Sequence, residues 1–217
     1  SRDWSSDVCS SDLTFEAIDP VRGITNLSSG KMGFALAKAA LEAGAYVHLI
    51  AGPCNLPTPL LSTGRITRTN VTSGAEMHRA TLASANCDVF FAVAAVADWT
   101  IANRAKQKIK RQEKTGLDLE FRSNPDILLD MAKLAKRKSK PYCVGFAAET
   151  DRLGKHAKEK RIKKGIPMIV GNIGPATFGL DTNEIIVVDE KGIKNLGQGN
   201  KLELARKLIA QVAARLP

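Results

Sequence analysis

A polar loop punctuated by glycines runs directly into a strongly helical segment between Asp19 and Gly33. Ser28 and Ser29 are good N-cap residues, Gly30 allows close approach of the backbone, and the residues that follow are rich in Ala and Leu. Unpaired amides at the start of such a helix bind anions, phosphate above all. An ordinary capped helix whose glycines serve only packing explains the pattern equally well. Other segments must decide between the two interpretations.

Two further polar residues could take part in chemistry. Asp98 follows the apolar run 92–97, so its carboxylate lies at the end of an expected buried strand. It either caps a loop or contacts a nucleotide or metal, and the neighbouring lysines favour the contact. Asn26 cannot act as a base, but its amide can donate hydrogen bonds to an acyl oxygen on which negative charge develops. By position alone, an Asx-turn residue is the commoner case for Asn26.

Composition limits the class of protein. The 217 residues, 44% hydrophobic and 5% aromatic, fit one α/β domain rich in Ala and Val. No apolar run approaches the roughly 18 to 20 residues that span a bilayer, and the N-terminus does not have the pattern of a signal peptide. We therefore expect a cytoplasmic protein without a membrane partner.

The four cysteines are widely spaced and have no histidine partners nearby: Cys9, Cys54, Cys87 and Cys143. This spacing indicates core or loop residues rather than a zinc site or a nucleophile.

The net charge of +10 is concentrated in three stretches, 104–114, 133–140 and 155–164. These stretches do not interleave arginines with aromatic residues, so they do not favour nucleic-acid binding. A nucleoside triphosphate together with a phosphorylated substrate accounts for part of the excess charge. The stretch 133–140 is interpreted as a solvated helix end. The basic arm of about residues 100–122 is too long for a simple connection.

From Ser29 onward, helical and strand patterns alternate, which predicts a Rossmann-like three-layer α/β fold with a mainly parallel sheet and the protruding basic arm. Helices are expected over 29–43, 74–84, 126–138, 151–164 and 201–216. Strands are expected over 46–51, 89–95, 142–147 and 168–171, with a hairpin of 184–189 and 192–195. Ligands of such sheets gather at the carboxyl ends of the strands, where 52–53, 94–98 and 146–150 fall.

Several motifs occur in the order in which one enzyme family carries similar segments, and this combination is far more specific than any single motif. They are Asp19 to Gly33, Gly52-Pro53 with Pro57-Thr58-Pro59, Val71-Thr72-Ser73 with Glu76-Met77, Ala94 to Trp99, Lys108-Ile109-Lys110-Arg111, Asn124-Pro125-Asp126-Ile127 and Val144 to Thr150. From about Asp19 to the C-terminus, the chain resembles phosphopantothenoylcysteine synthetase, the ligase that joins phosphopantothenate to L-cysteine in coenzyme A biosynthesis. It departs from the family at Gly23, where members often have an aromatic residue.

The resemblance implies the site residues. Asn26 would act on the activated acyl intermediate, and the remaining residues would bind the nucleotide. They are Ser28, Ser29, Gly30, Ala92, Val93, Ala94, Asp98, Lys108, Pro125, Asp126, Ile127, Leu128, Phe146, Lys160 and Lys164. Lys108 would reach the triphosphate from the arm. From the residues alone, Phe146 is as easily a core residue, and Lys160 and Lys164 are as easily a surface pair on one helix face.

The resemblance also implies a reaction through an acyl-nucleotidylate, with CTP rather than ATP as co-substrate and a Mg²⁺ ion across the triphosphate. No metal ligand is assigned. A homodimer is implied, and so is fusion of the natural protein to a flavin-dependent phosphopantothenoylcysteine decarboxylase domain, as in the bifunctional bacterial form. Two rival functions remain. A nicotinamide-dependent reductase would need a complete Gly-x-Gly-x-x-Gly after a strand, and a basic nucleic-acid module would need more aromatic residues.

Residues 1–13 differ from the rest of the chain. They combine Ser, Asp and Cys without a helical or strand period and resemble a translated sequencing adapter. We therefore predict that 1–13 is a non-native segment that contributes nothing to the fold and that 14–217 is the synthetase domain. The family places its first strand and a Gly-Gly-Thr turn at this point, so part of the phosphate-binding apparatus would be replaced or missing.

Overall fold

The computed structural model describes residues 7–11, 13–62, 65–110, 116–149, 152–173 and 180–216. Within these residues, the main sheet has eight strands. They are β1 (Asp7–Ser11), β4 (Val47–Ala51), β5 (Ile66–Asn70), β6 (Val89–Ala92), β9 (Tyr142–Glu149), β10 (Met168–Ile173), β11 (Thr182–Asp189) and β12 (Gly192–Asn200). Their order across the sheet is β12-β11-β10-β9-β6-β1-β4-β5. The six neighbouring strands β10, β9, β6, β1, β4 and β5 are parallel to one another. β11 and β12 add an antiparallel hairpin at the β10 edge. The predicted Rossmann-like fold is confirmed.

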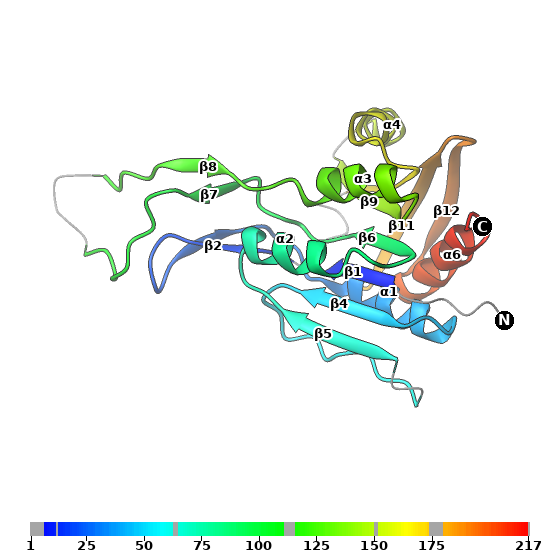
Figure 1. Cartoon of the computed structure of the whole chain (residues 1–217), viewed down its shortest axis with the longest axis horizontal. Coiled ribbons are helices and arrows are strands. Elements are labelled where there is room, and N and C mark those ends of the chain that lie inside the picture. The colour runs from blue at the N-terminus through cyan, green and yellow to red at the C-terminus, as the bar shows by residue number, and fades with distance from the viewer. Residues whose placement is uncertain are drawn as a thin grey trace.

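Helices cover both faces of the sheet (Figure 1). Helices α1 (Lys31–Glu42) and α6 (Lys201–Ala213) pack against each other on one face, and α2 (Gly74–Ala83), α3 (Ile127–Lys138) and α4 (Leu153–Lys164) form the other layer. Phe90 and Phe91 are successive residues of β6 and are both fully buried, one in each of the two apolar cores. Successive side chains of a strand point to opposite faces, so the central strands are apolar on both sides.

The prediction that residues 1–13 contribute nothing to the fold is wrong. Strand β1 lies in the middle of the sheet, where Asp7 pairs with Val47 of β4 on one side and with Val89 of β6 on the other. Leu13 forms a further bridge with Ala95. A central parallel strand is held by backbone hydrogen bonds to both neighbours, so an irregular side-chain pattern does not exclude it. Residues 1–6 and 12 lie outside the described residues, and the non-native origin of 1–13 stays a prediction.

The arm projects from the end of the sheet and carries two short antiparallel pairs, β2 (Phe15–Ala17) with β3 (Gly23–Thr25), and β7 (Trp99–Ile101) with β8 (Phe121–Ser123) (Figure 1). The predicted arm therefore begins and ends in paired strands rather than in a simple loop. Part of its tip, 111–115 with Arg111, lies outside the described residues.

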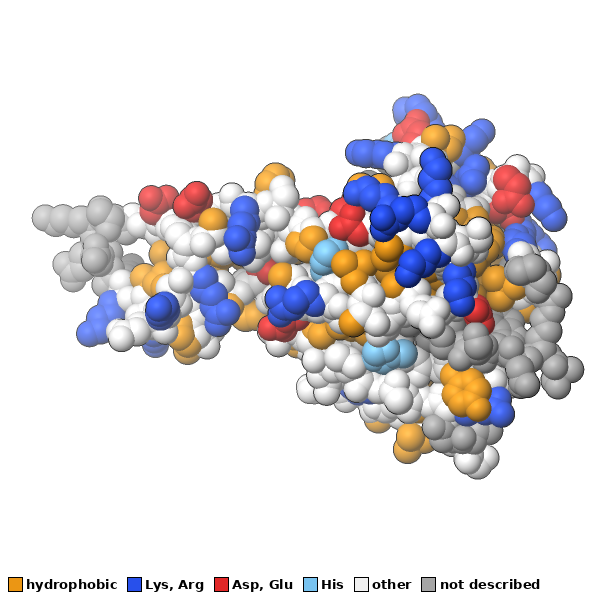
Figure 2. Space-filling model, viewed as in Figure 1, with side chains coloured by type: hydrophobic (Ala, Val, Ile, Leu, Met, Phe, Trp, Pro, Cys, Tyr) orange, Lys and Arg blue, Asp and Glu red, His pale blue; other side chains and the backbone are white. Residues whose placement is uncertain are grey.

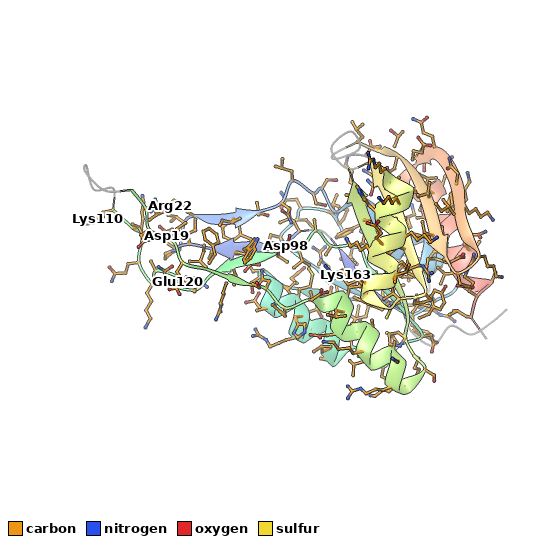
Figure 3. All side chains as sticks on the ribbon, turned by 90° about the horizontal axis from the view of Figure 1, so that it is seen from above. Asp19, Arg22, Asp98, Lys110, Glu120 and Lys163 are labelled. Atoms are coloured by element: carbon orange, nitrogen blue, oxygen red, sulfur yellow. The ribbon has the colours of Figure 1, made fainter. Side chains whose placement is uncertain are left out.

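The buried carboxylate of Asp19 links the turn between β2 and β3 to the segment that follows β7. Asp19 accepts hydrogen bonds from the amides of Val21 and Arg22 at 2.9 Å and from the amide of Ile109 at 3.1 Å. The Arg22 guanidinium bonds both the Asp19 carboxylate and the Ile109 carbonyl. Burial by itself raises the pKa of Asp19, but these hydrogen bonds outweigh it and lower the pKa to about 2. Asp19, Arg22, Lys110 and Glu120 lie together at the arm's far end in Figure 3.

The predicted helices and strands occur with shifted ends. α4 begins at Leu153, while the predicted start at Asp151 and the motif residue Thr150 lie outside the described residues. α3 ends at Lys138 in an exposed basic turn, which confirms the solvated helix end. In the part of the chain that the structure describes, no helix is long and apolar enough to cross a membrane.

Candidate active site

A cleft of about 660 Å³ opens at the carboxyl edge of the parallel strands. Its walls come from the loop before α1, the loop after β6, the start of α3, and residues of β9, β10, β11, α4 and α6. The cleft therefore crosses the edge of the sheet and is bordered by helices from both layers. This is where an open α/β sheet binds its ligands.

The structure brings the predicted site residues together, with one exception. Those that line the cleft are Asn26, Ser28, Ser29, Gly30, Ala92, Val93, Ala94, Asp98, Pro125, Asp126, Ile127, Leu128, Phe146, Lys160 and Lys164. Lys108 does not line it, because it lies exposed on the arm next to Ile109, which is bonded to Asp19. Figure 3 shows Asp98 between the far end of the arm and Lys163 of α4. What each residue binds stays a prediction.

The start of α1 differs from the expected serine cap. The N-cap is Gly30, whose φ of 67° lies in the left-handed region that glycine adopts readily, and no side chain caps the helix. The Ser28 hydroxyl instead accepts a bond from the Gly30 amide at 3.4 Å, within the loop. The predicted N-cap role of Ser28 and Ser29 is therefore wrong. The first turn of α1 borders the cleft, and the N-terminus of a helix favours an anion.

Asn26 lies at the junction of two loops. Its side-chain amide donates to the carbonyl oxygen of Ala95 at 2.9 Å, across the cleft wall that follows β6. The same loop is held by Thr14, whose hydroxyl accepts from the Ala97 amide at 3.0 Å, and by Asn124, whose amide donates to the Ala97 carbonyl at 2.9 Å. Asn26 is thus an exposed donor on a fixed support. Sequence reasoning did not identify the supporting roles of Thr14 and Asn124.

A neighbouring ring lies against Gly23, where the chain departs from the family. The Phe15 side chain, on the paired strand β2, lies so close that a Cβ on Gly23 would be 2.3 Å from its Cζ atom. The space beside Gly23 is therefore filled by an aromatic ring that comes from the paired strand. Thr25 adds a hydrogen bond from its hydroxyl to the Thr14 carbonyl at 2.8 Å.

Two lysines of α4 border the cleft from one side of the sheet. Lys160 donates to the carbonyl of Phe146 at 3.0 Å, and Lys164 forms an ion pair with Asp126. Asp126 also caps α3 by accepting from the Leu129 amide at 3.0 Å. These lysines are therefore part of the cleft wall and not a surface pair. Figure 2 shows that Lys and Arg side chains gather over the α3 and α4 layer.

Six polar residues of the cleft were not among the predicted site residues: Lys31, Ser123, Asn124, Asn172, Asn183 and Lys201. They belong to α1, to β8 and the loop that follows it, and to β10, β11 and α6. Two of them could have been noticed in the sequence. Lys31 and Lys201 are the first residues of their helices. A basic residue is unusual at that position, because the helix macrodipole favours acidic residues there.

Two of the cysteines lie in the core, as the sequence predicts. Cys87 and Cys143 are buried in the core, and burial raises the pKa of the Cys143 thiol to about 12. His48 lies between the hydroxyls of Thr69 and Ser84, each at 2.8 Å. Among the described residues, no three His, Cys, Asp or Glu side chains group closely enough to hold a metal ion.

Fold and cleft together define a Rossmann-like α/β protein with its ligand site at the carboxyl edge of the sheet. Residues 8–216 match the model of the family described as DNA/pantothenate metabolism flavoprotein C-terminal domain. The chain belongs to this family, and the relationship suggested by the sequence motifs is confirmed.

Two relatives illustrate the relationship. The chain is 42% identical to the coenzyme A biosynthesis bifunctional protein CoaBC of Haemophilus influenzae and 40% identical to that of Escherichia coli strain K12. Each alignment covers 93% of this chain and 50% of the relative, so the chain spans about half the length of these proteins. The crystal structure of the C-terminal domain of CoaBC superposes with a TM-score of 0.80 at 32% identity and covers 98% of this chain and 96% of that domain.

Proposed function

We propose that this chain is a phosphopantothenate-cysteine ligase that acts in coenzyme A biosynthesis. The observation that carries the proposal is the cleft itself, which brings Asn26, the start of α1 with its Gly30 N-cap and the lysines of α4 to one place. The similarity to the CoaBC proteins, whose name states a role in coenzyme A biosynthesis, supports it.

The reaction has two steps. A carboxylate oxygen of phosphopantothenate attacks the α-phosphorus of the nucleotide, an acyl–phosphate bond forms, and the bond to the leaving pyrophosphate breaks. The amine of cysteine then attacks the acyl carbon, a C–N bond forms, the nucleoside monophosphate leaves and the amine loses a proton. In the second step, the Asn26 amide donates to the acyl oxygen as negative charge develops there.

We propose CTP as the nucleotide, with ATP as the alternative. The contacts on the base and ribose come from the backbone of residues 92–94 and from Asp98, and Phe146 packs on the base. When bound, a magnesium ion neutralises charge on the triphosphate. The residues present fit this ion, because Mg²⁺ is usually held by one or two carboxylates and phosphate oxygens, and Asp98 is an exposed carboxylate of the cleft.

Lys108 is assigned to the triphosphate, although it lies outside the cleft of its own chain. It reaches a nucleotide either by movement of the arm or from a second copy of the chain, so we propose a homodimer. The bifunctional name of the CoaBC relatives, and the half of their length that this chain spans, support a natural fusion with a decarboxylase domain.

The deciding experiment measures pyrophosphate release with the purified chain. We expect release only when phosphopantothenate is present, faster with CTP than with ATP, and amide product by mass spectrometry only after cysteine is added. Omitting phosphopantothenate is the matched control. Release that does not depend on phosphopantothenate, or no amide with either nucleotide, contradicts the proposal.

A further inference from the structure

The cleft wall that leads to Asp98 is built from small apolar residues. Residues 93–97 are Val or Ala and lie between the strands β6 and β7. Ala97 is only 6% exposed, and a buried peptide needs one partner for its N–H and one for its C=O. The Thr14 hydroxyl accepts from the Ala97 amide at 3.0 Å, and the Asn124 side-chain amide donates to the Ala97 carbonyl at 2.9 Å. Side chains from other parts of the chain therefore set the position of the residue before Asp98.

Thr14 also holds the loop that carries Asn26. Its carbonyl accepts a hydrogen bond at 2.8 Å from the hydroxyl of Thr25, the residue before Asn26. Thr14 is fully buried, and so is its bond to the Ala97 amide, so water does not compete for that bond. One residue therefore connects the Asn26 loop to the segment that ends at Asp98.

The direct contact between these two segments is more open to solvent. Asn26 donates to the Ala95 carbonyl at 2.9 Å, and this hydrogen bond is exposed. Water competes with such a bond, so it restrains the two segments less than the buried bond of Thr14 does. An Asn amide has two N–H groups, and the reaction proposed above needs the second one as a donor to the acyl oxygen.

We propose that Thr14 is a positioning residue that fixes Asn26 relative to Asp98 for amide formation. The inference rests on the proposed function and adds to it the residue that aligns its two halves. In the intermediate, the acyl carbon is joined through an oxygen to the α-phosphorus, so the acyl oxygen lies where the bound nucleotide places it. The nucleotide is assigned to the segment of Asp98, whereas the donor belongs to the loop of Asn26. Thr14 does not line the cleft and acts through these two segments.

Asn124 restrains the Asp98 segment from the other side. Its side chain holds the Ala97 carbonyl, and its backbone amide donates to the Asp98 carbonyl at 2.9 Å. It directly precedes the predicted nucleotide-binding residues 125–128. We therefore expect loss of the Thr14 hydroxyl to leave the nucleotide contacts in place and to move only the Asn26 loop relative to them.

The test uses four single-residue variants. Thr14→Val removes the hydroxyl with little change in volume, and Thr14→Ser retains it. Thr25→Val breaks the other end of the bridge at an exposed position. Thr81→Val is the matched control, because Thr81 is also fully buried, does not line the cleft and has a hydroxyl without a hydrogen-bond partner in the described part of the chain.

The assay measures the two steps separately. Pyrophosphate release is followed with phosphopantothenate and CTP, cysteine is then added, and amide formation in a single turnover is measured by mass spectrometry. We expect amide formation to slow about 10- to 100-fold in Thr14→Val and in Thr25→Val, because a displacement of about 1 Å can cost about 100-fold in rate. Pyrophosphate release and the Kd for CTP stay unchanged. Thr14→Ser and Thr81→Val form the amide at the rate of the unaltered chain.

A double variant tests the bridge itself. If Thr14 joins the two segments, removal of either end breaks the same connection, so Thr14→Val combined with Thr25→Val is no slower than the slower single variant. Effects that multiply in the double variant indicate two independent local roles and overturn the inference.

The remaining outcomes also decide. Normal amide formation in both single variants overturns the inference and leaves the proposed function intact. A rise in the Kd for CTP that parallels the loss of amide formation assigns Thr14 to nucleotide binding instead. If the unaltered chain forms no amide, the proposed function fails and the inference fails with it. If thermal melts show that Thr14→Val is unfolded, the exposed variant Thr25→Val decides, through its rates of pyrophosphate release and amide formation.

Discussion

Removing strand β1 is the sharpest test of the architecture, because this strand has neighbours on both sides. It makes five residue pairs with β4 and four with β6. If each of these nine pairs stands for about one ladder hydrogen bond with a net value of about 1 kcal/mol, deletion of residues 1–11 costs on the order of 9 kcal/mol. Domains are stable by only about 5 to 15 kcal/mol in total. We therefore expect the shortened chain not to fold.

The assay is far-UV circular dichroism with urea unfolding of the shortened chain and of a point variant, Cys9→Pro. Proline at Cys9 removes one ladder donor in the middle of the sheet, so we expect a loss of about 3 kcal/mol or more and a lower urea midpoint. Leu60→Pro, in an exposed irregular segment, is the matched control and is expected to be neutral. A shortened chain that unfolds cooperatively at the same urea concentration as the full chain would refute the central position of β1.

Three further predictions concern single side chains. Asn26→Asp places a carboxylate where a donor is needed, so amide formation slows about 100- to 1000-fold and mass spectrometry shows the acyl-nucleotidylate accumulating; a normal rate makes Asn26 a turn residue only. Lys108→Gln raises the KM for CTP and leaves the Tm almost unchanged. A lower Tm with an unchanged KM for CTP would assign Lys108 to structure instead. Asp19→Asn lowers the urea midpoint at pH 7. Because the folded pKa of about 2 is below the unfolded value near 3.9, this stabilisation is complete above about pH 4 and is lost as the pH falls through 2; a pH-independent difference contradicts it.

The sequence was most informative about the fold where side-chain periodicity and packing coincide. The apolar stripes of α1, α3 and α6 bury one face each, and their predicted ranges contain the observed helices. Strand β1 was missed because its stability comes from backbone pairing on two sides, which no side-chain pattern records. Strand β5 was missed for a related reason, since it is an edge strand with one aliphatic residue, Ile66, and is partly exposed.

The site was predictable where chain direction alone places residues. Asp98 and Phe146 follow parallel strands, and the carboxyl ends of such strands meet at one edge. Lys201 could not be placed in this way, because α6 follows an antiparallel hairpin and is positioned by its packing on α1 and on the two hairpin strands. The hydrogen bonds of Asp19 to the arm are similarly long-range, joining Asp19 to Ile109, and no local pattern indicates them.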